Sequence, residues 1–506
     1  MAGKIFDWVG YGAYRYPNKT ASIELPSGRR QSYAEMHERV GRAAAWLRSL
    51  GVERGDRVGV LALNSQDTLD LIFATWRIGA VHLALNFRLT AEELDYIIGN
   101  AEPKVLVYDA MLTATVEALT VEIEHVLDTG GEGGESAFES ALVGREPVRE
   151  QVDLEPDDLC LLMYSSGTTG RPKGVMITHG MMVWANANAG ASMRCSEDMV
   201  SLAVMPLFHI GGLQVFTCPA LYNGGTAIVM RTFDPGATLD ALADPALGVT
   251  HFLGVPAIFN ALRDHPKNPG TDFSGLQVVL AGAEAVPVPL VKWWLERGVV
   301  IQEGYGMTEN TASCCVLPKE NVATHVGSAG KPLRHTAMRV VREDGTDCDV
   351  GESGELWCKG PIVTPGYWRR EDANADTFVD GWLRTGDIGS RDAEGFYYVE
   401  DRLKDMYISG GENVYPAEVE SLLYEIETIA EVAVIGVPDE RWGEVGCAVV
   451  AVKEGQLLEA QTVLAYGRDR LARFKQPAHV VFVDALPRNA TGKVLKYQLR
   501  QTVKVG

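Results

Sequence analysis

The alternation of strand and helix patterns predicts an α/β protein with a large N-terminal domain and a small C-terminal domain of α+β type. Buried-type strands alternate with helical patterns over 1–150, and the same rhythm returns over 201–301. Such alternation is typical of parallel, doubly wound sheets, so two α/β layers are expected. From 402 onward, strands and helices form a further unit of about 100 residues, a size at which domains fold independently.

The expected strands of the two layers are short apolar runs. In the first layer these runs are 56–63, 79–85 and 104–108. Thr90 with Glu93 has the capping-box pattern that opens a helix. In the second layer the runs are 202–205, 226–230, 250–253, 277–280 and 299–301. We expect ligands in the crevice at which these strands end.

After about residue 330 the expected strands and helices follow a different pattern. Between about 330 and 399 the strands are short and separated by glycine turns, which predicts a small β-barrel-like subdomain within the N-terminal domain. In the C-terminal unit, helices are expected at 416–424 and 461–474. The strands of this unit are expected at 429–437, 446–452 and 479–483.

Composition bounds the function. The chain has 506 residues, 46% of them apolar and 22% charged, and a net charge of −21, which argues against a general nucleic-acid-binding protein. Its eight cysteines form no CxxC pair and no signal peptide is evident, so a cytoplasmic protein with reduced thiols is expected. No apolar run is long enough for a membrane span. Peripheral membrane contact and a homodimer are left open.

The run SSGTTGRPKG (165–174) predicts a phosphate-binding loop. Its small residues allow close backbone approach, its hydroxyls donate hydrogen bonds, and Lys173 adds a positive charge. Gly174 follows the lysine where a Walker A loop has Ser or Thr, and apolar runs on both sides predict strand–loop–strand rather than a linker. The candidate ligand-binding residues are Ser165, Ser166, Gly167, Thr168, Thr169, Gly170 and Lys173.

This loop resembles the signature loop of the adenylate-forming enzymes, among them acyl-CoA synthetases, aryl-CoA ligases, luciferases and peptide-synthetase adenylation domains. The resemblance extends over essentially the whole chain, from the strand at Asp56 to Lys493, with the motifs in family order. It implies ATP, Mg²⁺ and CoA as cofactor and co-substrates, together with a small carboxylic acid. The chain ends soon after Gln498, without the carrier domain that normally follows a peptide-synthetase domain.

A second motif, GYGMTE (304–309), follows a strand. Tyr305 offers an aromatic face and Glu309 offers a hard oxygen ligand suited to Mg²⁺, although a structural turn would explain these residues equally well. The resemblance implies that Tyr305 stacks on adenine and that Thr168 and Glu309 serve the Mg²⁺ and the phosphates. It also assigns to the nucleotide pocket Gly282, Ala283, Glu284, Gly304, Gly306 and Thr308.

Asp387 and Arg402 are candidates for the ribose. A carboxylate can accept both hydroxyl hydrogens of a diol, but a turn aspartate and an exposed salt bridge are the structural alternatives. The resemblance assigns both residues to the ribose and places a hinge at Lys404. It therefore divides the chain into a domain of 1–403, which binds ATP and the acyl group, and a mobile lid domain of 404–506.

Three further sites follow from the resemblance. Lys493, which on its own would be a solvated charge in a turn, matches the catalytic lysine of adenylation, where a cation reduces the repulsion between a carboxylate and a phosphate. Gly410 and Gly411 match the loop that lines the tunnel for the pantetheine arm. His209 matches a gate between the acyl site and this tunnel, with a core or capping role as the alternative.

The expected activity is that of an ATP-dependent acyl-CoA synthetase, which forms an acyl-adenylate and then a thioester. The stretch 401–416 is similar to bacterial fatty-acyl-CoA synthetases, so a medium- or long-chain fatty acid is the first expectation. Aryl-CoA ligases of the coumarate type have nearly the same residues, which makes an aromatic acid the alternative. A non-catalytic nucleotide-binding protein is the alternative of another class, and the joint presence of the motif residues argues against it. No serine-hydrolase elbow or zinc-ligand spacing occurs.

Overall fold

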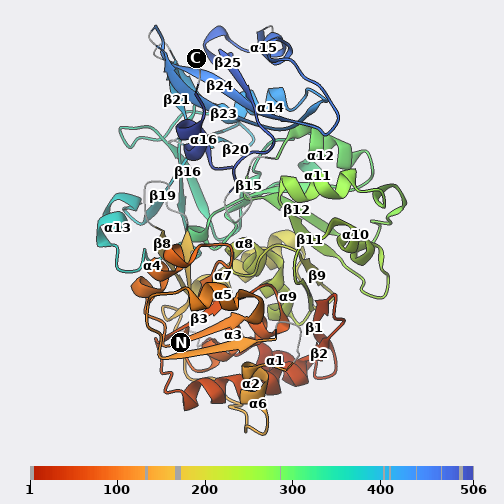
Figure 1. The fold of residues 1–506 in the computed structure, drawn as a ribbon, viewed down its shortest axis with the longest axis vertical. Helices are drawn as coiled ribbons and strands as arrows, with labels where there is room; N and C mark the ends of the chain where they lie inside the picture. Colours follow the sequence, from red (N-terminus) through yellow and green to blue (C-terminus); the bar gives the residue numbers. More distant parts are fainter. Residues whose placement is uncertain are drawn as a thin grey trace.

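The computed structural model describes residues 5–130, 135–165, 172–284, 286–402, 405–409, 412–439, 441–468, 470–488 and 494–504 (Figure 1). The first α/β layer, in orange, lies at the bottom of the view, and the second, in green, lies above it on the right. The C-terminal α+β unit, in blue, lies at the top. The predicted fold class is confirmed.

The first sheet has the strand order β6-β5-β3-β4-β7-β8, and its neighbours are parallel except for β7 and β8. Its strands are β3 (Arg57–Leu61), β4 (Val81–Leu85), β5 (Val105–Asp109), β6 (His125–Thr129), β7 (Leu159–Ser165) and β8 (Lys173–Thr178). Its helices are α2 (Tyr33–Ser49), α3 (Gln66–Arg77), α4 (Ala91–Ala101), α5 (Thr113–Glu117), α6 (Ala137–Leu142) and α7 (His179–Met193). Because β7 and β8 pair antiparallel, the predicted strand–loop–strand arrangement of the phosphate loop is confirmed.

The second sheet has the order β15-β14-β13-β12-β11-β9-β10-β1-β2. Its strands are β1 (Thr20–Leu25), β2 (Arg30–Ser32), β9 (Val200–Ala203), β10 (Thr226–Met230), β11 (His251–Gly254), β12 (Val278–Gly282), β13 (Ile301–Tyr305), β14 (Cys315–Val316) and β15 (Lys331–Pro332). Its helices are α1 (Trp8–Arg15), α8 (Ile210–Gly212), α9 (Cys218–Asn223), α10 (Pro235–Ala243), α11 (Pro256–Asp264) and α12 (Val288–Leu295). No strand is predicted at 20–25 or 30–32, and although both segments lie in the stretch 1–150 assigned to the first layer, β1 pairs in parallel with β10 of the second sheet. A partner about two hundred residues away in the chain therefore decides their sheet.

The two layers share one hydrophobic core. Val60 and Met163 of the first sheet belong to the same cluster of buried residues as Val229 and Val278 of the second. Asn64, at the end of β3, adds a polar link between the layers. Its side-chain amide donates to the carbonyls of Met205 (3.0 Å) and Met230 (3.1 Å). The carboxyl-end edges of the sheets are thereby fixed relative to each other.

The rest of the chain is built on two smaller sheets. The first of these has the antiparallel strands β16 (Ala337–Val341), β17 (Gly354–Lys359), β18 (Phe378–Val379), β19 (Trp382–Arg391) and β20 (Tyr397–Arg402), with helix α13 (Glu371–Thr377). The C-terminal sheet has the strands β21 (Tyr407–Ser409), β22 (Glu412–Val414), β23 (Ile429–Asp439), β24 (Gly443–Val452) and β25 (His479–Phe482). Its helices are α14 (Pro416–Leu423), α15 (Ala460–Arg468) and α16 (Lys496–Thr502). The predicted division at Lys404 stays a prediction, because 403–404 lie outside the described residues.

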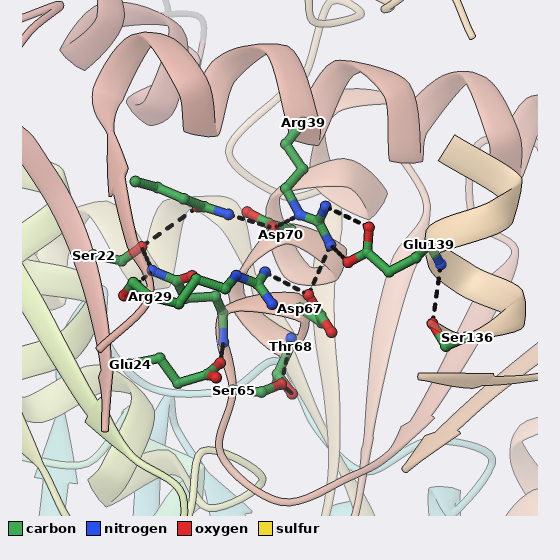
Figure 2. Close-up of polar contacts among 12 residues, drawn as sticks. Ser22, Glu24, Arg29, Arg39, Ser65, Asp67, Thr68, Asp70, Ser136 and Glu139 are labelled. Carbon is green, nitrogen blue, oxygen red and sulfur yellow. Dashed lines mark hydrogen bonds and ion pairs between the residues drawn. The ribbon is translucent and has the colours of Figure 1, made fainter. Parts of the chain in front are cut away.

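A network of charges, buried at Asp67 and Asp70, joins Arg29, which precedes β2, to α2, α3 and α6 (Figure 2). Asp67 accepts hydrogen bonds from Arg29 (2.7 Å) and Arg39 (2.8 Å). The Nε of Arg39 lies 2.6 Å from the Oδ2 of Asp70, and the same guanidinium pairs with Glu139. Burial, together with the charge of Asp67, raises the pKa of Asp70 to about 6 despite the neighbouring arginine. The network therefore contributes a pH-dependent component to stability.

Within the described residues, no helix has both the length and the apolar character that crossing a bilayer requires. All eight cysteines lie in the described parts of the chain, and each is buried and free. Burial raises the pKa of Cys447 to about 11, so this thiol is protonated at neutral pH.

Candidate active site

The phosphate loop is closed at its base by a strand pair. Ser165 at the end of β7 and Lys173 at the start of β8 are register partners, so these two predicted residues lie side by side. The Nζ of Lys173 lies 4.7 Å from the ring centroid of Tyr367, within the range of a cation–π contact. The other predicted loop residues, which are Ser166, Gly167, Thr168, Thr169 and Gly170, lie outside the described residues.

Glu309 lies in a short 3₁₀ turn, Thr308–Asn310, that follows β13. Its side chain accepts a hydrogen bond from the hydroxyl of Tyr367 at 2.9 Å, and only 5% of the residue is exposed. Thr311 and Ala312 follow the turn with φ angles of 56° and 79°, in the left-handed region that non-glycine residues seldom adopt. Such strain commonly marks a functional site. The predicted metal-binding carboxylate is therefore buried, hydrogen-bonded to Tyr367 and followed by two residues with strained backbone.

Tyr305 and Asp387 meet although 82 residues separate them in the chain. The tyrosine, at the end of β13, donates its hydroxyl hydrogen to the Oδ2 of Asp387 on β19 at 2.7 Å. Burial, and then the charge of Asp387, raise the pKa of Tyr305 well above its usual value, so its hydroxyl remains a donor. Asp387 is also the register partner of Arg402 on β20. Three residues predicted to bind the nucleoside are thus brought together.

Gly282 and Gly304 are register partners at the ends of the parallel strands β12 and β13. A Cβ atom at Gly282 would lie 2.6 Å from the carbonyl oxygen of Gly304, and one at Gly306 would lie 2.1 Å from that of Ala312. Both glycines are therefore required by close packing of the backbone.

His209 caps the short helix α8, because its Nδ1 accepts a hydrogen bond from the amide of Gly211 at 3.1 Å. A π-helical turn, Leu213–Thr217, follows α8, and such turns occur frequently at functional sites. Asn64 anchors the chain just before the histidine by accepting the amide hydrogen of Leu207 at 2.8 Å. The capping alternative is thus observed, and the role of His209 as a gate stays a prediction.

Arg488 links the C-terminal unit to the nucleotide pocket predicted from the sequence. Its Nη1 lies 3.6 Å from Glu284, which follows β12, and its Nη2 lies 2.5 Å from Glu431 on β23. Arg488 and Val494, which flank Lys493 in the sequence, form a β-bridge. Through its pair with Glu284, Arg488 lies beside the carboxyl end of β12 in the second sheet. Besides the five residues of the phosphate loop, four further predicted residues lie outside the described residues, namely Lys404, Gly410, Gly411 and Lys493.

Sequence reasoning did not identify Tyr367, Asn64 and Arg488 as part of the site. A tyrosine after Pro-Gly, an asparagine after an apolar strand and an arginine in a turn are ordinary features of α/β proteins. Their significance depends on contacts with residues far away in the chain, which spacing alone does not indicate.

The family described as AMP-binding enzyme matches residues 11–368, and its C-terminal domain matches residues 418–493. Feruloyl-CoA synthase of Amycolatopsis sp is 42% identical over 494 residues, which cover 98% of each chain. Indoleacetate–CoA ligase of Aromatoleum aromaticum is 38% identical over 504 residues, 99% of this chain and 98% of that enzyme. The long-chain-fatty-acid–CoA ligase FadD13 of Mycobacterium tuberculosis is 35% identical over 485 residues, covering 96% of this chain and 95% of that enzyme.

Solved structures of MatB from Rhodopseudomonas palustris, 33% identical, match 98% of both chains. The TM-score is 0.90 for the ATP-bound structure and 0.79 for the apo structure. Since coverage is equal, the arrangement of parts in this chain is closer to that of the ATP-bound neighbour. With the family matched along most of its length, the chain belongs to the AMP-binding enzymes and is an acid–CoA ligase of the adenylate-forming kind.

Proposed function

We propose that this ligase activates an aromatic carboxylic acid with ATP, through an acyl-adenylate, and transfers the acyl group to CoA. The observation that carries the mechanism is two hydrogen-bonded pairs, Tyr305 with Asp387 and Tyr367 with Glu309, in which Tyr305 ends β13 and Glu309 lies in the turn that follows it. The first pair suits a nucleoside and the second suits phosphates and a cation.

In this proposal Asp387 accepts the ribose hydroxyls, and its bond to Tyr305 holds the carboxylate while the tyrosine ring faces adenine. Arg402, the register partner of Asp387, supports the same sugar. Lys173, at the base of the phosphate loop, lowers the cost of bringing the triphosphate into the site, since a cation there offsets negative charge.

Glu309 fits a magnesium site. Mg²⁺ is usually held by one or two carboxylates together with substrate phosphates, rather than by a cage of protein ligands. The described residues contain no cluster of three or more His, Cys, Asp or Glu side chains suited to a metal, and Glu309 is a buried carboxylate with a fixed orientation. Thr168 is the proposed second ligand. Magnesium, when bound, would supply charge neutralisation on the phosphates.

Two half-reactions share this site. In the first, a carboxylate oxygen of the acid attacks the α-phosphorus of ATP, and the bond to the bridging oxygen breaks so that pyrophosphate leaves. Lys493 offsets the negative charge that approaches the phosphate. In the second, the CoA thiolate attacks the acyl carbonyl and AMP leaves. We infer that rotation of the C-terminal domain at Lys404 moves Lys493 out of the active site and brings in Gly410 and Gly411, because each half-reaction needs different residues to line the site.

The aromatic acid is favoured by the relatives. The enzymes at 42% and 38% identity are named for ferulate and indoleacetate, whereas the fatty-acid ligase is 35% identical. The sequence itself favours a fatty acid, because the stretch 401–416 is similar to bacterial fatty-acyl-CoA synthetases. A medium- or long-chain fatty acid is therefore the second candidate. A cytoplasmic location also remains a prediction from the sequence.

The test is acid-dependent release of pyrophosphate with ferulate, indoleacetate, octanoate and palmitate, each with and without CoA. We expect the highest kcat/KM with an aromatic acid, and a thioester product only when CoA is present. If palmitate were the only one of these acids to give turnover, the proposed substrate would be a fatty acid instead of an aromatic acid. Pyrophosphate release without any thioester would contradict the transfer to CoA, and binding of ATP without turnover would favour a non-catalytic protein.

A further inference from the structure

The segment 364–368 lies beside β8, the strand that leaves the phosphate loop. Val175 and Tyr367 form an antiparallel bridge, and the amide of Met176 donates to the carbonyl of Gly366 at 3.1 Å. Main-chain bonds therefore fix the position of Tyr367 relative to the base of the phosphate loop. The segment also reaches Glu309, whose carbonyl accepts the amide hydrogen of Thr364 at 2.8 Å.

The side chain of Tyr367 contacts two groups of different charge. Its hydroxyl donates to the Oε1 of Glu309 at 2.9 Å, and its ring centroid lies 4.7 Å from the Nζ of Lys173. Only 6% of the residue is exposed, so water competes little for either contact. One buried side chain thus touches the predicted metal-binding carboxylate and the cation of the phosphate loop.

Tyrosine suits this position chemically. A tyrosine hydroxyl, whose ordinary pKa is about 10, is protonated at neutral pH and donates a hydrogen bond to the carboxylate. A donor to one oxygen limits rotation of the carboxylate without neutralising it. Partners that orient a metal ligand in this way commonly alter metal affinity or activity about 10–100-fold when they are removed.

We propose that Tyr367 is a positioning residue that holds the Glu309 carboxylate for the magnesium–ATP complex and aligns it with Lys173. The inference rests on the proposed function, because it assigns Glu309 to the cation and Lys173 to the phosphates. Tyr367 itself touches neither the acid nor the reacting phosphorus in this role. Its effect passes through Glu309, and it therefore depends on the metal.

Tyr367→Phe tests the role, since it keeps the ring and removes only the hydroxyl. Titration calorimetry should show the dissociation constant of ATP in saturating Mg²⁺ rising about 10-fold, in the range for metal-orienting partners. With EDTA in place of Mg²⁺, the dissociation constant of ATP should change less than about twofold, because the cation–π contact is retained. In pyrophosphate release, the Mg²⁺ concentration that gives half-maximal rate should rise in parallel.

Tyr33→Phe is the matched control. Tyr33 is completely buried in α2, and its hydroxyl donates to the carbonyl of Gly225 at 2.7 Å, at a place that no predicted site residue occupies. Both variants lose one buried hydroxyl, so both should lose thermal stability. Only the change at Tyr367 should alter the dependence on Mg²⁺.

A folded Tyr367→Phe protein with unchanged Mg²⁺ dependence would overturn the proposal, as would an equal loss of ATP affinity with Mg²⁺ and with EDTA. An identical Mg²⁺ effect in Tyr33→Phe would overturn it too, because the effect would then be one of stability. The proposed function fails separately, if wild-type protein binds magnesium–ATP but releases no pyrophosphate with any acid. Calorimetry would still decide the role of Tyr367 in that case.

Discussion

Replacing Asp387 by asparagine removes the negative charge from the Tyr305–Asp387 pair and hardly changes the shape of the side chain. The carboxylate is 6% exposed, accepts the Tyr305 hydroxyl at 2.7 Å and is itself preceded by the turn at Gly386, whose φ is 70°. An amide can still accept the tyrosine hydrogen through its oxygen, but its nitrogen is a donor only. The amide of the Asp387→Asn variant could therefore not accept hydrogen bonds from the tyrosine and from both ribose hydroxyls.

The decrease in kcat/KM for ATP can be estimated as the loss of one charge-assisted hydrogen bond. A hydrogen bond to a charged group contributes about 1.5–3 kcal/mol, which corresponds to about 10–100-fold in kcat/KM for ATP. Because the ribose does not change charge during the reaction, most of the effect should appear in the KM for ATP rather than in kcat.

The assay compares ATP with 2′-deoxy-ATP and 3′-deoxy-ATP. The wild type should prefer ATP by about 10-fold or more in kcat/KM, and Asp387→Asn should reduce this preference towards one. Asp392→Asn is the matched control, since Asp392 also accepts a tyrosine hydroxyl, from Tyr398 at 3.2 Å, in the same β19–β20 hairpin. If Asp387→Asn kept the full preference for ATP, the assignment of Asp387 to the ribose would be wrong.

Three more changes probe Lys493, the ion pair of Arg488 with Glu284, and the buried network around Asp70. Lys493→Ala should slow adenylation roughly 100-fold, as expected for loss of a charge-stabilising group, while transfer from supplied acyl-adenylate to CoA is retained; equal loss in both half-reactions would contradict the proposed rotation. Arg488→Glu should slow adenylation by a factor of about 2–5, typical of a partly exposed ion pair. Because Arg488 also pairs with Glu431, the reversal adds both Glu284→Arg and Glu431→Arg, which should restore part of the rate in a stopped-flow assay; no recovery would contradict a role of these ion pairs in adenylation. Because the pKa of Asp70 is raised in the folded state, folding takes up a proton, and the free energy of unfolding contributed by this group falls as the pH rises from about 4 to about 6. In urea unfolding measured between pH 4 and pH 8, Asp70→Asn should remove this pH-dependent part of the free energy of unfolding. If the free energy of unfolding depended on pH as in the wild type, the raised pKa of Asp70 would be contradicted.

Most strands of the two layers could be predicted from the sequence because they are local apolar runs, whereas β1, β2, β6, β14 and β15 are not among the predicted strands. Their sheet membership could not be predicted in every case. β1 and β2 lie early in the chain but join the second sheet, since β1 pairs with β10. Local patterns indicate that a strand exists, whereas its neighbours depend on contacts between distant segments.

The same limit applies to the site. Tyr305, Glu309 and Asp387 could be assigned to the nucleotide and the metal only through the family resemblance, and the bond between Tyr305 and Asp387 spans 82 residues. The resemblance assigns Gly306 to the nucleotide pocket, whereas the close approach of the Ala312 carbonyl already requires a glycine there. Tyr367 was missed because its importance comes from Glu309, which is 58 residues away.

The most direct test of the account is a single-turnover reaction with ATP labelled at the α-phosphate and ferulate, first without CoA and then with it. We predict a labelled acyl-adenylate on the enzyme without CoA, which is converted to labelled AMP and feruloyl-CoA when CoA is added. Formation of labelled ADP, or of AMP from ATP without any acid-dependent adenylate, would contradict the proposed two-step mechanism.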